Sequence, residues 1–411
     1  MGQKHKNLFD KIITLKNFWE AYRLTSLGKK NSMEYLRYKE YDGKHIHDTI
    51  DRVVAGQYHP GEFNVFTVYD PKKRIVRALP FRDRVVQHAI HNVIGPIFEG
   101  VFLHGSYACR PERGTHEGVK YVQAYLRKHP NSYYLKLDFK DYFNSIDRTI
   151  LWKEVERKIR CPKTLDLLSR FHPKEGKGLP VGNLTSQLLA NVYGHILDRH
   201  LTHVLKVPFW CRYIDDTVIL SDDREYLVNL QKELTKFIDT EMKLRWSRWS
   251  IAHNSRGINF LGYRIFIKYK LLRRRSVVGA KRKIRQYLQK DDKIKLKNFM
   301  GAWRGHLIFA NSYNLRMKIL GEPMKRIIQS RKDLDAIKGT QEYKDFLELL
   351  KGSMVVKRDM AQYPEDYDQN LKEGDDGFIP KDFQEVEDLS TIEKFGYNKE
   401  EFEDELRRRL G

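Results

Sequence analysis

Two short acidic segments, 77 residues apart, constrain the fold of this chain more than any other feature of its sequence. The first is Asp138, which stands near the end of the apolar run 133–139. The second is the pair Asp215-Asp216, which lies within the apolar and aromatic run 209–220. Both runs are rich in β-branched and aromatic residues, so both predict strands, and the second predicts a hairpin with the acids at its tip. A single sheet could then bring all three carboxylates close together.

Carboxylates that lie close together repel one another unless a cation sits between them. Two Mg²⁺ ions about 4 Å apart supply that charge in nucleotidyl transfer, where they hold the attacking and leaving oxygens. Taken singly, Asp138 could be a solvated strand residue, and Asp215-Asp216 could be a turn signal like Asp222-Asp223. The order of an acidic strand, a long helix and an aromatic-x-Asp-Asp hairpin favours a polymerase.

The charge of the chain is strongly basic and unevenly distributed. The net charge is +22, and residues 1–330 carry 62 basic and 32 acidic side chains, whereas residues 331–411 carry 14 and 22. Such a field favours a polyanionic partner, and nucleic acid is the first candidate. A membrane surface is a weaker candidate because no basic amphipathic segment accompanies a lipidation signal. The acidic tail is expected to pack on the basic body or on a second protomer.

The three cysteines and the hydropathy bear on the cellular compartment. Cys109, Cys161 and Cys211 are too few and too scattered for a zinc site or a disulfide framework, so they indicate buried thiols in a reducing compartment. The sequence lacks an apolar run of about 18 residues and an apolar signal core at its start. These features predict a cytoplasmic protein.

Periodicity and turn residues predict a mixed α and β chain. Helices are expected over 8–27, 82–98, from about 118 to 128, 149–171, 184–205, 224–241 and 340–351, with two or three more within 273–330. Hairpins are expected over 60–80, with a basic turn at 70–73, and around 260–263, and a further strand is expected near 244–252. On the strand 133–139, Tyr134, Lys136 and Asp138 should share one face.

Residues 7–330 resemble the reverse transcriptases. Residues 74–84 resemble the fingers motif shared with group II intron enzymes, and residues 106–116 resemble their template-side block. Residues 178–191 resemble the substrate-binding block, but Val181 and Gln187 replace the usual Gln and Pro. That variant is typical of diversity-generating retroelement enzymes and of some antiviral, defence-associated bacterial reverse transcriptases. It hints at loosened selection of the incoming base.

The resemblance implies roles for individual residues around the nucleotide. Asp138, Asp215 and Asp216, with the backbone carbonyl of Phe139, would hold two Mg²⁺ ions. Phe143 would exclude a 2′-hydroxyl, so that the product is DNA. Contacts with the incoming nucleotide are expected from Lys72, Arg74, Gly182, Ser186 and Gln187.

The resemblance also implies contacts with nucleic acid. Arg110 and Arg113 would contact the template, and the turn containing Phe260 and Gly262 would steady the primer end. A lysine expected before this turn is not evident, and Arg248 is its nearest match. The basic residues expected to hold the duplex are Arg273, Arg274, Arg275, Lys281 and Arg282.

The expected architecture is an α+β right-hand polymerase with fingers, palm and thumb, whose palm is an antiparallel sheet backed by helices. The expected parts are an N-terminal helix with the fingers (1–128), the palm (129–270, including the loop and helix at 173–205), a basic helical thumb (271–330) and an acidic C-terminal extension (331–411).

Three functions are compatible with these observations. The first is RNA-directed synthesis of cDNA from dNTPs on a dedicated structured non-coding RNA, in antiviral defence. The second is a diversity-generating enzyme that makes mutagenic cDNA with an accessory protein. The third is a catalytically idle RNA-binding scaffold, which the intact set of three acids argues against. The acidic tail favours the first over the second.

Overall fold

The computed structural model describes residues 4–30, 32–39, 43–69, 74–312 and 315. The chain divides into two compact units, Met1–Arg273 and Arg274–Gly411. The basic turn at 70–73, which contains Lys72, lies outside the described residues. The same holds for the expected helix at 340–351 and for the acidic extension.

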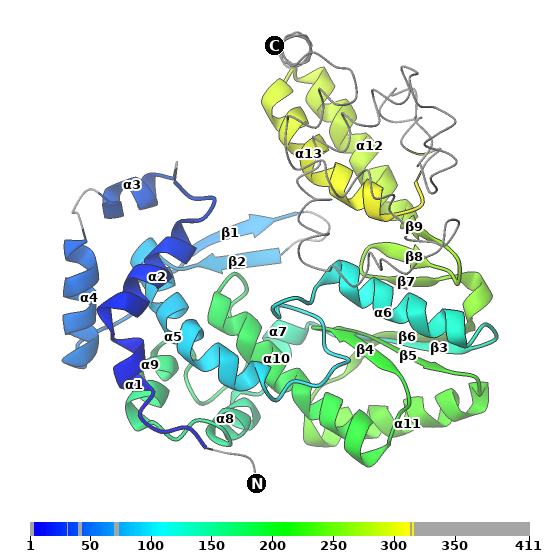
Figure 1. Ribbon diagram of the computed structural model, residues 1–411, viewed down its shortest axis with the longest axis horizontal. Coiled ribbons are helices and arrows are strands. Elements are labelled where there is room, and N and C mark those ends of the chain that lie inside the picture. Colours follow the sequence, from blue (N-terminus) through cyan, green and yellow to red (C-terminus); the bar gives the residue numbers. More distant parts are fainter. Residues whose placement is uncertain (1–3, 31, 40–42, 70–73, 313–314, 316–411) are drawn as a thin grey trace, which may run out of the picture. The chain divides into compact units, whose positions relative to one another are not determined.

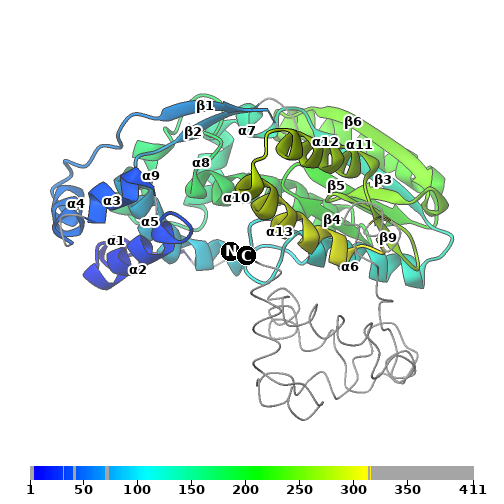
Figure 2. The same cartoon turned by 90° about the horizontal axis from the view of Figure 1, so that it is seen from above.

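The first unit begins with helices and a hairpin. These elements are α1 (Phe9–Ile12), α2 (Leu15–Ser26), α3 (Met33–Lys39), α4 (Lys44–Val54), β1 (Asn64–Val68), β2 (Arg74–Ala78) and α5 (Phe81–Glu99). The single helix expected over 8–27 is wrong, because Thr14 is extended and its side chain caps α2 by accepting from the Asn17 amide. Figures 1 and 2 both show the β1–β2 hairpin extending away from the N-terminal helices α1 to α4.

The middle of the unit supplies a run of helices around the first acidic strand. They are α6 (Thr115–Lys128), α7 (Tyr142–Ser145), α8 (Arg148–Glu156), α9 (Pro162–Phe171), α10 (Leu184–Arg199) and the π-helix η1 (His200–Val204). The single helix expected over 149–171 is also wrong. Pro162 starts a second helix there, at a position where its missing amide hydrogen costs nothing.

A four-stranded antiparallel sheet forms the centre of the unit. Its strands are β3 (Tyr133–Phe139), β4 (Trp210–Tyr213), β5 (Asp216–Ser221) and β6 (Trp246–His253), in the order β4–β5–β3–β6. Leu135, Leu137 and Phe139 are buried on one face of β3, and Lys136 and Asp138 lie on the other, as predicted. Helix α11 (Arg224–Glu241) packs against β3, β5 and β6, on the side of the sheet opposite α6 (Figure 1).

A second, smaller sheet follows the four-stranded sheet, which is the sheet expected for the palm and is called the palm sheet below. The short 3₁₀ helix η2 (Asn254–Arg256) leads into β7 (Ile258–Phe260), β8 (Tyr263–Ile265) and β9 (Lys270–Leu272). Leu261 and Gly262 both have positive φ angles in the predicted β7–β8 turn. The third strand, β9, was not predicted. The second unit contains two basic helices within the described residues, α12 (Arg274–Gln289) and α13 (Lys293–Phe309).

One hydrophobic core runs through the first unit. It joins side chains from α1, α5, β3, α10 and α11, so the expected fingers and palm share buried contacts rather than forming separate cores. Among the described residues, no helix combines the length and the apolar character needed to cross a membrane.

Asn254 ties the end of β6 to the chain that enters β3, and this clamp can be tested. Its side chain is buried, and Nδ2 donates to the Pro130 carbonyl at 2.9 Å and to Ser132 Oγ at 3.1 Å. Asn254→Ala should lower the free energy of unfolding by roughly 1–3 kcal/mol, since it leaves buried acceptors unpaired. Urea unfolding measures the change. The exposed neighbour Ser255→Ala is the control, and an equal loss for both variants would contradict the assignment.

Candidate active site

Strand pairing brings the three predicted acids to one end of the palm sheet. Asp138 of β3 lies directly opposite Asp216, the first residue of β5. Asp216 also pairs with Tyr213 of β4, so Ile214 and Asp215 form the tip of the hairpin. The Phe139 amide donates to the Asp215 carbonyl at 3.2 Å, which fastens this tip to the end of β3.

Basic side chains contact two of the acids. Lys136 Nζ lies 3.0 Å from Asp216 Oδ2, and Arg273 Nη2 lies 4.0 Å from the same oxygen. Arg248 Nε donates to Asp138 Oδ2 at 3.1 Å. Because like charges placed opposite each other on a sheet destabilise it, these cations offset the cost of gathering the acids.

A bulge in β6 shapes the surroundings of Asp138. Asp138 pairs with Arg248, but Phe139 pairs with Trp246, so Ser247 is an extra residue in β6. Its hydroxyl donates to Asp138 Oδ2 at 2.9 Å and contacts the Asp138 carbonyl at 3.1 Å. Bulges often re-aim side chains beside active sites, and here the bulge places a hydroxyl on the acid.

Burial determines the ionisation of Asp216. It raises the pKa of this carboxyl to about 6, although Lys136 opposes the shift. Burial also lowers the pKa of the Lys136 ammonium. Asp216 Oδ1 is buried without a hydrogen-bond partner. A buried carboxylate oxygen left in this way is one that a bound cation would satisfy.

No group of three or more His, Cys, Asp or Glu side chains within the described part of the chain is gathered closely enough to hold a metal ion. The fit to a metal therefore rests on two carboxylates, the cross-strand pair Asp138 and Asp216, and on the unpartnered oxygen of Asp216. Asp215 lies at the adjacent hairpin tip, and the structure does not gather all three predicted acids into one group.

The predicted nucleotide block contacts the fingers hairpin. The Arg77 amide of β2 donates to the Val181 carbonyl at 2.9 Å. Gly182 has a φ of +112°, and a Cβ there would lie 2.8 Å from Val76 Cγ1. Arg74 is exposed on the same strand as Val76.

The other predicted nucleotide residues occupy different environments. Ser186 is buried in the first turn of α10, and Gln187 is exposed beside it. Phe143 is partly buried against the core, and its carbonyl accepts from the Leu179 amide at 2.8 Å.

The predicted primer turn lies close to Lys136. Phe260 is fully buried, with Lys136 Nζ 5.9 Å from its ring centroid, and Gly262 has a φ of +90°. The Gly262 carbonyl accepts from the Arg273 amide at 3.0 Å, so Arg273 links this turn to Asp216.

The two predicted template arginines differ in their placement. Arg110 is buried, and its guanidinium binds Glu99 at 2.6 Å and the carbonyls of Leu103 and Ser106. These contacts favour a structural role for Arg110 instead of the template contact expected from the sequence. Arg113 is partly exposed and lies over the Tyr107 ring, 4.9 Å from its centroid.

The basic residues predicted for the thumb lie on α12, apart from Arg273. The four residues on α12 are exposed within the second unit: Arg274, Arg275, Lys281 and Arg282.

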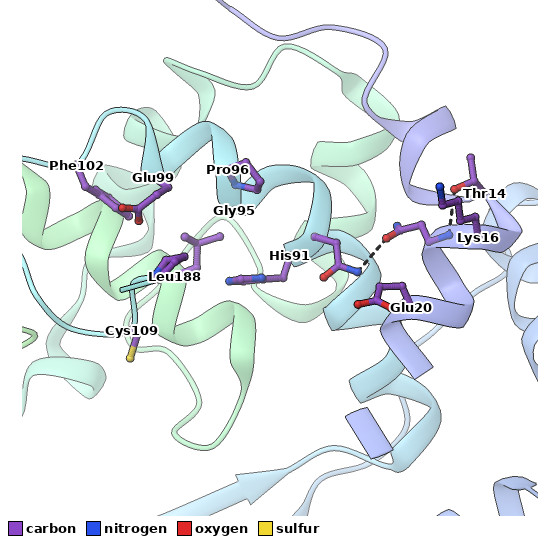
Figure 3. Close-up of a pocket in the computed structure, with 13 residues that line it drawn as sticks. Thr14, Lys16, Glu20, His91, Gly95, Pro96, Glu99, Phe102, Cys109 and Leu188 are labelled. Carbon is purple, nitrogen blue, oxygen red and sulfur yellow. Dashed lines mark hydrogen bonds between the residues drawn. The ribbon is translucent and has the colours of Figure 1, made fainter. Parts of the chain in front are cut away.

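A cavity of about 640 Å³ lies elsewhere, along α5, and α2, the loop after α5 and α10 also line it (Figure 3). Lys16, Glu20, His91 and Glu99 are among its lining residues, and none of the three acids lines it.

A buried ion pair close to the hairpin tip was not predicted from the sequence. Arg212 of β4 and Asp198 of α10 are both fully buried and meet at 2.6 Å. A detectable signal was present, because Arg212 is a charged residue within the apolar run that precedes the Asp pair.

Sequence comparison finds known proteins that are similar to this chain. Residues 69–265 match the family model described as "Reverse transcriptase (RNA-dependent DNA polymerase)". The chain carries a reverse transcriptase domain. It is related to bacterial reverse transcriptases and to the enzymes of group II introns, so its enzymatic class is that of an RNA-directed DNA polymerase.

Individual relatives are distant. Protein YkfC of Escherichia coli is 26% identical over 61% of this chain and 76% of its own length. The group II intron-encoded protein LtrA of Lactococcus lactis is 24% identical over 70% of this chain, which spans 63% of LtrA. The retron Ec73 reverse transcriptase of Escherichia coli is 27% identical over 54% of this chain and 70% of its own length. Among solved structures, apo telomerase from Candida tropicalis has a TM-score of 0.40 at 8% identity, with 56% of this chain and 52% of that chain covered.

The contact between Gly182 and β2 generates a prediction. Gly182→Ala should reduce nucleotide incorporation by roughly tenfold or more, because the new methyl group would push Val76 and the hairpin away from the nucleotide block. Single-nucleotide extension at saturating template measures this loss. Gly56→Ala is a matched control, since Gly56 also has a positive φ but has no atom within 4 Å of its Cβ position. Equal activity for the two variants would count against a role for this contact.

Proposed function

We propose that this protein synthesises cDNA from dNTPs on a dedicated structured RNA, by nucleotidyl transfer assisted by two Mg²⁺ ions. The observation that carries the proposal is the cross-strand pair Asp138 and Asp216, with Asp215 beside it, inside a reverse transcriptase domain. Asp138 and Asp216 lie opposite each other because of the strand register, although they are far apart in the sequence.

Asp138, Asp215 and Asp216, together with the Phe139 carbonyl, are the residues that would hold the ions. When bound, divalent ions supply positive charge to the attacking primer hydroxyl and to the leaving pyrophosphate. The unpartnered oxygen of Asp216 supports this assignment. The chain's own cations, Lys136 and Arg248, neutralise part of the acidic charge at the same place.

The fingers and the nucleotide block would bind the dNTP. Arg74, with Lys72 just before it in the sequence, would contact the triphosphate, because a guanidinium fork suits phosphate oxygens. Phe143 would exclude a 2′-hydroxyl, and Gly182, Ser186 and Gln187 would line the nucleotide position. The contact between β2 and the Val181 carbonyl supports this arrangement, because it joins the two segments.

Nucleic acid would be held by basic side chains on both units. Arg113 would contact the template, Phe260 and Gly262 would form the primer turn, and Arg273 would lie beside that turn. The exposed residues Arg274, Arg275, Lys281 and Arg282 on α12 would contact phosphates of the duplex, so duplex affinity should fall steeply with added salt.

For the biological role we favour antiviral defence with a non-coding RNA in the bacterial cytoplasm. The basic surplus of residues 1–330 and the Val181 and Gln187 variant support this setting. The same variant supports a diversity-generating enzyme with an accessory protein, which is the second candidate. Neighbouring genes distinguish them, because a variable target gene with repeat copies belongs only to the second.

Removing single acids tests the chemistry. Asp138→Asn and Asp215→Asn should each lower primer extension by on the order of a thousandfold, which corresponds to about 4 kcal/mol of lost charge stabilisation. RNA binding should persist. The control is Asp222→Asn, which removes an exposed acid just after β5 that pairs with His129. If the Asp138 and Asp215 variants extend primers as well as Asp222→Asn does, the assignment of the acids fails. A wild-type protein that binds RNA but does not extend primers would favour the catalytically idle RNA-binding scaffold.

Sequencing the nucleic acid that copurifies with the protein tests the template. One structured RNA, enriched together with complementary DNA, is expected for the wild-type protein. The Asp215→Asn variant should retain the RNA and lose the DNA. Random cellular RNA with no enriched species would contradict a dedicated template.

A further inference from the structure

Arg212 is a charged side chain placed in the interior of the palm. It lies in β4 and is fully buried, and it is the largest of the fully buried side chains among the described residues. Burying an ion is unfavourable unless a partner compensates for the lost hydration. Its Nε and Nη2 donate to the two carboxylate oxygens of Asp198 at 2.6 Å each, and Asp198 is itself fully buried on α10. This pair is therefore a fixed internal feature rather than a surface contact.

The remaining nitrogen of the guanidinium reaches the catalytic hairpin. Arg212 Nη1 donates to the Ile214 carbonyl at 3.1 Å. Ile214 has a φ of +54°, a left-handed conformation that is strained for a β-branched residue. The next carbonyl, that of Asp215, accepts from the Phe139 amide. Both carbonyls at the hairpin tip are thus held from outside the hairpin loop, one of them by Arg212.

The surrounding chain is built to admit this side chain. A Cβ on Gly194 of α10 would overlap the guanidinium of Arg212, so a larger residue there would displace that guanidinium. Ser106 Oγ lies 3.2 Å from Arg212 Nη2. The Arg212 amide donates to the Gly105 carbonyl at 2.7 Å, so the loop before α6 is fastened to β4 at the same place.

We propose that Arg212, oriented by Asp198, is a positioning residue that holds the strained Ile214–Asp215 tip in the conformation in which Asp215 can bind metal. The proposal rests on the proposed function, since it assigns Asp215 to metal binding. A guanidinium suits this task because its planar fork binds a carboxylate through two nitrogens and still donates in a third direction. A lysine ammonium offers a single nitrogen and cannot span both partners. The same pair ties α10, which begins with the nucleotide block, to the hairpin that carries the acid.

Arg212→Lys and Asp198→Asn test this role. Each variant should lower kcat for nucleotide addition by roughly 10–100-fold and raise the Mg²⁺ concentration that gives half-maximal rate, which is the range seen when groups behind metal ligands are removed. The KM for dNTP should change little, because the nucleotide block is retained. The affinity for Mn²⁺ in the absence of nucleotide should weaken by a similar factor. It is measured from the decrease of the free-ion electron paramagnetic resonance signal as Mn²⁺ binds.

The control separates positioning from stability. Asn254→Ala also removes buried hydrogen bonds from the palm sheet, but at the other end of β3. It should lower stability in urea while it leaves kcat and Mn²⁺ affinity unchanged in the folded protein.

Three outcomes would overturn the proposal. The first is a folded Arg212→Lys or Asp198→Asn protein with wild-type kcat and Mn²⁺ affinity. The second is activity that falls only in proportion to the folded fraction. The third is failure of both variants to fold while Asn254→Ala folds, which would assign the pair to stability alone. A wild-type protein that does not polymerise would instead refute the proposed function.

Discussion

The antiparallel pairing of β3 with β5 is the constraint on which the site depends. It sets Asp138 opposite Asp216 and leaves Asp215 at the hairpin tip beside them. A slip of one residue would turn Leu135 and Leu137 toward the opposite face and would separate the acids, so burial of one face fixes the register. The same core that stabilises the palm therefore also determines which carboxylates meet. This coupling places two acids side by side although repulsion between them opposes the arrangement.

Much of this fold could be predicted from local sequence, and the misses have identifiable causes. The bounds of β3 and α11 agree with prediction, because their periodicity is clear and Asp223 caps α11. The helices expected over 8–27 and 149–171 are each interrupted, since a capping Thr14 and a helix-starting Pro162 prevail over an apolar spacing that continues through them. Strand β9 is only three residues long, and its partner β8 stabilises it, so its own residues carry too little signal.

The candidate site was predictable in its acids and much less so in their partners. Arg248 contacts Asp138 across 110 positions in sequence, and the bulge at Ser247, which no motif announces, determines that contact. Arg110 was expected at the template, but Glu99 and nearby carbonyls hold it in the interior. Side chains of one type thus face outward or inward according to which carbonyls and carboxylates surround them, and that environment exists only after folding.

The cations around the acids belong to two physically different classes. Arg248 has a side chain that is 69% exposed, so its bond to Asp138 contributes little and can be exchanged for another cation at small cost. Arg212 is 0% exposed and meets Asp198 away from water, so neither partner can leave without stranding a buried charge. The exposed cation compensates charge at a site where a divalent ion would need to enter. The buried cation fixes the backbone that carries the acid. A site that exchanges ions needs both kinds of cation. The cation that balances the charge of the acids must be replaceable, whereas the backbone that carries the acids must stay fixed.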